Sequence, residues 1–222
     1  NKDIRKRIYF TLFALTIFKI GTSIQVPGTQ AIESLGFLEL LNSISGGAMQ
    51  KFSIFGLGVM PYISASIIIS ILQKDIIPYL SELSKQGEIG RQKLNAITRY
   101  LGIFLALFEG YALSYAFVSK TAAFVEHAQV ALILTAGTCF LLWIGDQITQ
   151  KGIGNGVSLI IMAGIISTLP SMIATVYTSL VDTATMQTLA LGITELIIFI
   201  LVYFAIVIGV IYEQKAERRI PI

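Results

Sequence analysis

The fold class is decided by residues 189–212, which read LALGITELIIFILVYFAIVIGVIY. Glu195 is the only charged side chain in this stretch, and it lies near one end. A helix that crosses a bilayer needs about 20 consecutive, mostly apolar residues, whereas a surface helix of a soluble protein shows a polar face. We therefore predict that residues 189–212 form a membrane-spanning helix.

Five further stretches have the same apolar character: residues 8–24, 52–72, 100–118, 128–148 and 157–177, the last interrupted by Pro170. Over the 222 residues, 55% are hydrophobic and 13% are charged, about half of the charged fraction of a soluble domain. The mean hydropathy is +0.77. This composition excludes a soluble globular protein and a disordered one. We predict an all-α, polytopic membrane bundle of about six helices.

The basic residues predict the orientation of this bundle. With six spans, the side that holds both termini carries all but three of the 16 Lys and Arg residues. The opposite side holds Lys51 and Lys120, and Lys19 lies within the first span. Because cytoplasmic loops carry the excess of Lys and Arg, both termini are expected in the cytoplasm. The first span is expected to be a retained helix rather than a cleaved signal peptide.

The first connection on the opposite side, residues 25–51, has an unusual apolar pattern. Its apolar side chains lie mostly three residues apart, at Ile32, Leu35, Leu38, Leu41 and Ile44. This spacing predicts a helix of about a dozen residues, too short to span a bilayer, which ends before Gly46 and Gly47. Two interpretations remain open: an amphipathic helix at the membrane surface, and a helix folded back into the membrane within protein.

Catalysis and metal binding have little support in the sequence. Cys139 and His127 are the only cysteine and histidine, which excludes a disulfide, a cysteine metal site and a His-pair site. We expect His127 to be a solvated loop residue. The run GIGNG at 152–156 lacks the spacing of a nucleotide-binding loop and is interpreted as a tight turn. We predict no enzyme activity and no cofactor or metal.

Several long motifs resemble the SecY family, the channel subunit of the bacterial Sec translocon. They are FSIFGLGVMPYISASI at 52–67, KQGEIGRQKL at 85–94, WIGDQIT at 143–149 and GIGNG at 152–156, with VPG at 26–28 and RRIP at 218–221. The resemblance implies ten helices in two inverted halves, of which this chain would carry six. Residues 1–188 would be helices 1–5 with a plug at 29–47. Residues 189–222 would be the sixth helix and the start of a cytoplasmic loop, and helices 7–10 would be absent.

The resemblance also implies roles for particular residues. An apolar pore ring would be formed by Val59, Ile63, Ile161 and Ile165, since residues four apart share a helix face. The plug would be the stripe from Ile32 to Ile44, which favours the folded-back interpretation. A lateral gate would include Ser64, Ile67, Ser70 and Glu109, and Arg218 and Arg219 would contact cytoplasmic partners.

Glu109 departs from the family pattern, which more often has a neutral polar residue at about this place. A bare carboxylate at the bilayer centre costs roughly 2.5–3.5 kcal/mol, so Glu109 is expected to face protein or water. Ser66 or Ser70 is a candidate hydrogen-bond donor to it. Two roles remain open: helix packing, and tuning of gate opening.

The implied function is passage of unfolded polypeptides across the bacterial plasma membrane and sideways release of signal or transmembrane segments into lipid. The implied partners are SecE, SecG, nascent chains, lipids, and the motor ATPase SecA or the ribosome, with no nucleic-acid recognition beyond ribosome docking. Two alternatives are an accessory channel for a restricted set of exported proteins and a small-solute carrier. A carrier is disfavoured because intramembrane ionisable residues are few: Lys19, Glu109 and Glu195.

Overall fold

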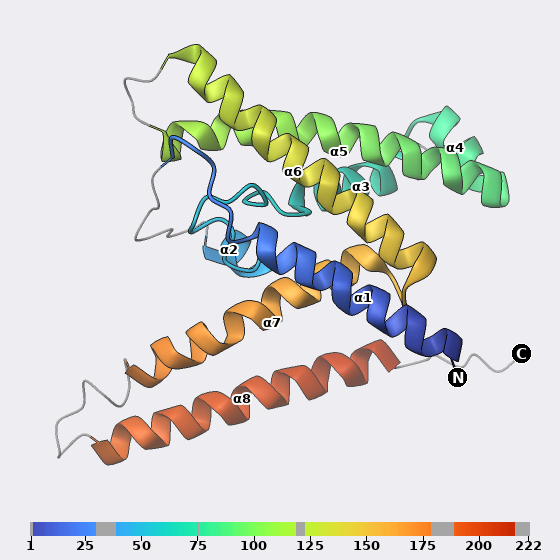
Figure 1. Cartoon of the computed structure of the whole chain (residues 1–222). Helices are drawn as coiled ribbons and strands as arrows, with labels where there is room; N and C mark the ends of the chain where they lie inside the picture. Colours follow the sequence, from blue (N-terminus) through green and yellow to red (C-terminus); the bar gives the residue numbers. More distant parts are fainter. Residues whose placement is uncertain (1, 30–38, 75, 119–122, 179–188, 216–222) are drawn as a thin grey trace, which may run out of the picture. The chain divides into compact units, whose positions relative to one another are not determined.

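The structure is a computed structural model that describes residues 2–29, 39–74, 76–118, 123–178 and 189–215. These residues form helices and one isolated β-bridge, between Gln25 and Ser53, which confirms the all-α class (Figure 1). The helices are α1 Lys2–Gly21, α2 Glu39–Ile44, α3 Met60–Leu72, α4 Pro78–Lys85, α5 Gly87–Phe117, α6 Phe124–Lys151, α7 Gly156–Tyr177 and α8 Leu189–Lys215.

The chain divides into two units, residues 1–168 and residues 169–222, and each is described by itself. The division falls inside α7, just before Pro170. Pro170 does not end the helix, although a proline removes one backbone hydrogen bond. The second unit contains the rest of α7 and α8, and α8 confirms that the apolar stretch 189–212 is helical.

Four helices among the described residues are long and apolar enough to cross a membrane: Gly87–Phe117, Phe124–Lys151, Gly156–Tyr177 and Gly192–Gln214. They correspond to the third, fourth, fifth and sixth predicted spans. α1 covers the first predicted span only as far as Gly21, and it begins at Lys2, so it includes charged first turns as well as Lys19. Because of these charges, α1 is not one of the four helices that are apolar enough to cross a membrane.

The prediction of a continuous helix over residues 52–72 is wrong. α3 begins only at Met60 and has 13 residues, about 20 Å of helix against the ~30 Å of a bilayer core. The preceding backbone pairs with the chain after α1: Val26 N–H donates to Phe52 O at 2.9 Å, and Ile54 N–H donates to Ile24 O at 2.9 Å. Irregular backbone is tolerated at membrane depth where protein surrounds it.

Two apolar clusters bury this irregular segment in the first unit. One joins Phe55 and Val59 to buried side chains of α1, α6 and α7. The other joins Phe52 and Leu57 to α5 and α6. Phe52 has a φ of +43°, unusual for a bulky side chain, and its ring stacks on Phe117 with centroids 3.9 Å apart. The segment is therefore held from several sides.

Small residues allow the helices of the first unit to approach closely, as in other membrane proteins. α5 and α6 make the most extensive helix contact, and α3 packs on α5. A Cβ built on Gly102 of α5 would lie 3.2 Å from the Cα of Tyr62 in α3. One built on Gly137 of α6 would clash with the carbonyl oxygen of Ile54. Glycine at positions 102 and 137 therefore allows α5 to approach α3, and α6 to approach the irregular segment, more closely than a residue with a Cβ would.

Candidate functional site

Three of the four side chains predicted to form the pore ring meet in one apolar cluster. Val59 is buried at the N-cap of α3, and its carbonyl accepts a 3.1 Å hydrogen bond from Ile63 N–H. Ile161 of α7 packs in the same cluster, beside the buried Ile160. Ile165 lies about one turn further along α7, is 41% exposed and is not part of that cluster of described residues. The structure thus joins the start of α3 to the start of α7.

The chain that follows α2 packs directly against α7. Gly46 and Gly47 have φ values of +73° and +81°, so the helix ends in the left-handed conformation that glycine favours. A Cβ built on Gly164 of α7 would clash with the carbonyl oxygen of Ile44. One built on Gly46 would lie 3.2 Å from the Cα of Gly164. Gly164 lies three residues after Ile161, so this backbone contact lies about one helical turn from Ile161 on α7.

Asn42 organises the end of α2, a role that sequence reasoning missed. Its carbonyl accepts hydrogen bonds from Gly47 N–H at 2.8 Å and from the Ser45 hydroxyl at 3.1 Å. Its side-chain oxygen accepts a third from Gln50 N–H at 2.8 Å. An asparagine four residues before a glycine pair is a signal that could have been noted, because Asn side chains form hydrogen bonds with nearby backbone in turns.

The predicted plug is described only in part. Ile32, Leu35 and Leu38 lie outside the described residues, and Leu41 lies in α2 with only its backbone described. Ile44, at the end of α2, is half-buried. The folded-back interpretation therefore stays a prediction, and Arg218 and Arg219 also lie outside the described residues.

Glu109 and Ser64, two of the predicted gate residues, line one cavity of about 310 Å³. The cavity lies between α3, α5 and the irregular segment, and Met49, Leu57 and Met60 provide its apolar wall. Ser64 of α3, rather than Ser66 or Ser70, is the hydroxyl that lines this cavity among the described residues. Helical position explains this result: Ser70 is exposed, whereas Ser64 faces the contact with α5.

The other two gate candidates, Ile67 and Ser70, lie along α3 at increasing distance from this cavity. Both are exposed, and Ile67 has 56% of its surface accessible. The buried face of α3 is formed instead by Pro61, Ala65 and Ile69. The predicted gate residues thus divide into a cavity-lining pair and an exposed pair.

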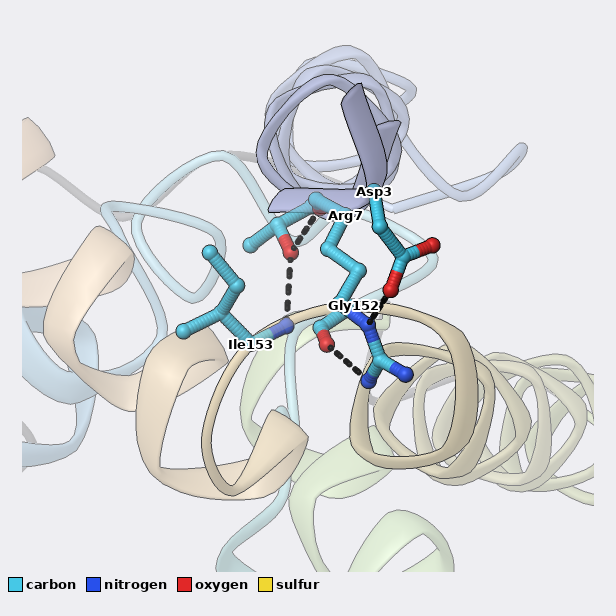
Figure 2. Close-up of polar contacts among 5 residues, drawn as sticks. Asp3, Arg7, Gly152 and Ile153 are labelled. Atoms are coloured by element: carbon cyan, nitrogen blue, oxygen red, sulfur yellow. Dashed lines mark hydrogen bonds and ion pairs between the residues drawn. The ribbon is translucent and has the colours of Figure 1, made fainter. Parts of the chain in front are cut away.

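The turn between α6 and α7 is fixed by α1, a contact that the sequence did not reveal (Figure 2). Arg7 of α1 donates to Gly152 O at 3.4 Å and forms an ion pair with Asp3 at 3.6 Å. The Thr11 hydroxyl accepts a 3.2 Å hydrogen bond from Ile153 N–H and donates to Arg7 O. The start of α7, and therefore Ile161, is positioned partly by α1.

The glycines of this turn serve close packing, which agrees with the prediction of a tight turn at 152–156. Gly154 has a φ of +72°. A Cβ on Gly156 would clash with Gly145 O, and a Cβ on Gly152 would clash with the Thr11 hydroxyl. Gly156 N–H donates to the Thr149 hydroxyl at 2.8 Å. Gly152 and Gly156 thus allow the turn to pack closely against α1 and α6.

The expectation that His127 is a solvated loop residue is wrong. His127 lies in the first turns of α6, is 4% exposed, and its Nδ1 is 2.9 Å from the hydroxyl of Ser114 in α5. The Tyr115 ring stacks on it with centroids 4.2 Å apart. The Ser114 hydroxyl also donates to Tyr111 O at 2.6 Å, so its single proton is used and His127 Nδ1–H is the donor of the pair. This buried pair joins the ends of α5 and α6.

A family model described as SecY matches residues 53–222. The chain belongs to the SecY family. Protein translocase subunit SecY of Staphylococcus aureus is 44% identical over an alignment 239 residues long, which covers 100% of this chain and 54% of the relative. The Staphylococcus epidermidis subunit gives the same values. The chain thus spans about half the length of these SecY relatives.

Solved structures show the same fold at low sequence identity. Sec61 in a canine ribosome–channel complex from the endoplasmic reticulum matches with a TM-score of 0.70 and 19% identity, over 99% of this chain and 50% of that chain. A structure described as a protein conducting channel matches with a TM-score of 0.63 and 19% identity, over 79% and 38%. The resemblance to SecY, inferred from the sequence, is confirmed.

Proposed function

We propose that this chain forms part of a protein-conducting channel of the Sec pathway in the bacterial plasma membrane. The channel passes unfolded polypeptides across the membrane and releases signal or transmembrane segments sideways into lipid. Membership of the SecY family supports this function, and the chain itself would carry no catalysis. SecE, SecG, and SecA or the ribosome are the proposed partners, with Arg218 and Arg219 on the cytoplasmic side.

One observation carries the proposal: Val59, Ile63 and Ile161 converge beside the backbone contact of Ile44 with Gly164. An apolar constriction excludes ions by dewetting but can widen for a peptide. In the proposal, Ile63 and Ile161 are the parts of the ring nearest the passing chain, because both are only partly buried. The predicted plug, residues 29–47, would close the constriction.

A split channel tests the proposal. The chain, with Cys139 changed to Ala, is co-expressed with the part of Staphylococcus aureus SecY that it does not cover. We expect Ile63→Cys to crosslink to a stalled secretory precursor, while Ile71→Cys, on the exposed part of α3, does not. Equal crosslinking at both positions would refute the pore assignment. Solute uptake without precursor translocation would favour a carrier instead.

A further inference from the structure

Residues 44–47, at the end of α2 and just after it, are held between α1 and α7, and we call them the docked segment. A Cβ built on Gly46 would lie 3.2 Å from the Cα of Gly164 in α7 and 3.5 Å from the ring atom Cζ of Phe18 in α1. Phe18 is 1% exposed. Both helices therefore contact the docked segment at the same residue.

Thr11 joins the same two helices at the turn that leads into α7 (Figure 2). Its hydroxyl accepts the 3.2 Å hydrogen bond from Ile153 N–H and donates its own proton to Arg7 O at 2.9 Å. A Cβ built on Gly152 would clash with this hydroxyl, so no side chain separates α1 from the turn here. Thr11 thus fixes the position of the turn on α1.

The distance between these two joints is similar along both helices. Residues three or four apart share a helix face, and the buried positions follow this spacing: Thr11, Ala14 and Phe18 in α1, and Gly156, Ile160 and Gly164 in α7. Thr11 and Phe18 are about 10 Å apart along α1, and Gly156 and Gly164 are about 12 Å apart along α7. The buried faces of both helices therefore lead from the turn to the docked segment.

We propose that Thr11 is a positioning residue for the docked segment, because it holds α7 where Gly164 and Phe18 both contact Gly46. The contact of Gly164 with Ile44 and Gly46 is made by backbone atoms, so no side chain can adapt if α7 shifts. Close-packed elements respond to small shifts by changing between discrete arrangements. Loss of the Thr11 hydrogen bond should therefore raise the fraction of molecules in which the docked segment has left α7.

Other hydrogen bonds in the turn have a local role. Gly156 N–H donates to the Thr149 hydroxyl at 2.8 Å, and Ser158 N–H donates to Asn155 Oδ1 at 3.1 Å. These bonds shape the turn but do not reach α1. Arg7 does reach it, through Gly152 O at 3.4 Å, but half of its side chain is exposed and water can replace the bond. Thr11 is only 8% exposed, so its hydroxyl is the stronger candidate.

The consequence for a channel rests on the proposed function. The docked segment is the end of the predicted plug, so the Thr11 hydrogen bond would favour the closed channel. Given the predicted orientation, this control would act from the cytoplasmic side, where α1 begins. Thr11 would then influence the constriction without contacting the passing chain.

Cysteine labelling tests the position of the docked segment in membrane vesicles that contain the split channel. Cys139 is changed to Ala, and Ser45, which is 2% exposed, is changed to Cys and labelled with maleimide. Thr11→Val should raise the labelling rate about two- to tenfold, the effect of losing one hydrogen bond. Thr11→Ser keeps a hydroxyl and should label at the wild-type rate. Thr16→Val, which removes an exposed hydroxyl bonded within α1, should also leave the rate unchanged.

A second variant and a second reporter separate positioning from general loosening. Gly152→Ala places a Cβ against the Thr11 hydroxyl and should also raise the labelling of Ser45→Cys, which keeps the test open if Thr11→Val does not fold. Ser114→Cys, between α5 and α6 and 0% exposed before substitution, should label equally slowly in all variants. In Gly164→Ala, where the contact with the docked segment is already weakened, Thr11→Val should add less than its factor in the wild type.

Four results would overturn the role of Thr11. They are wild-type labelling of Ser45→Cys in both Thr11→Val and Gly152→Ala, an equal rise at Ser45→Cys and Ser114→Cys, a rise in Thr11→Ser as large as in Thr11→Val, and full multiplication of the Thr11→Val and Gly164→Ala factors. Labelling needs no precursor, so these results would leave the proposed channel function standing. A wild-type split channel that translocates no precursor would instead refute that function and leave the labelling result intact.

Discussion

Replacing Gly164 by Ala should release the chain that follows α2 from α7. In the structure, a Cβ at this position would clash with Ile44 O and lie 3.1 Å from Gly46 N. Both atoms are backbone, so no side chain can rotate away and the segment itself must shift. Overpacking of this kind costs about 1–3 kcal/mol. Alanine also favours helix in α7, but it does so whether the segment is docked or released, so that gain cancels.

If the packed state, in which the chain after α2 contacts α7, is destabilised by about 1–3 kcal/mol, the fraction of molecules in which this contact is broken rises about 5- to 150-fold. We call this second state the released state. Ser45 reports this population because it is 2% exposed when the segment is docked. With Cys139 changed to Ala and Ser45 changed to Cys, maleimide reacts through the released state. The rate of labelling in membrane vesicles should therefore rise by the same factor in Gly164→Ala.

Gly209→Ala is the matched control, because its Cβ would have nothing within 4 Å. It makes the same chemical change in the helix α8 and should leave the labelling of Ser45→Cys unchanged. If Gly164→Ala labels at the wild-type rate, the backbone contact does not hold the segment, and the reasoning from Gly164 fails. A rise in both variants would point to a general loosening rather than to release.

Three further outcomes are expected. In the split channel, Ile63→Ser should wet the constriction and raise ion conductance, whereas Ile165→Ser should change it much less, because that side chain lies outside the cluster. Glu109→Gln should favour the closed gate, so that precursors with weak signal sequences translocate less efficiently; identical translocation across the neutral pH range would leave Glu109 a packing residue. Thr11→Val removes the hydroxyl that accepts a hydrogen bond from Ile153 N–H, in the turn between α6 and α7. It should lower the free energy of unfolding by about 1–3 kcal/mol. Thr16→Val removes an exposed hydroxyl that donates only to Leu12 O within α1, and it should lower the stability measured by thermal unfolding far less.

The pore-ring candidates show what the spacing of residues in the sequence can and cannot predict. Val59 and Ile63 were paired because residues four apart share a helix face, and the hydrogen bond between them has helical spacing. The same argument paired Ile161 with Ile165, yet the latter is exposed. Spacing places residues on one face of a helix, but the neighbouring elements decide how much of that face they cover.

His127 and Glu109 show the same limit for polar residues. The sequence placed the histidine in a loop next to a span, where exposure is the usual outcome, and it could not show that Ser114 and Tyr115 would cover it. It placed Glu109 in a span and predicted that the carboxylate faces protein or water; in the structure Glu109 lines a cavity together with Ser64. The identity of the nearby hydroxyl depended on the packing of α3 against α5.

The sequence by itself determined the membrane class, the helical character and the tight turn at Gly152–Gly156. These properties depend on hydropathy over about 20 neighbouring residues and on local backbone preference. Only the tertiary structure decided where α3 begins, which glycines allow backbone contact, and that Thr11 holds Ile153. Hydropathy is equally high for a spanning helix and for irregular chain buried among helices. A hydrogen bond between residues 142 positions apart exists only once the packing of α1, α6 and α7 has brought them together.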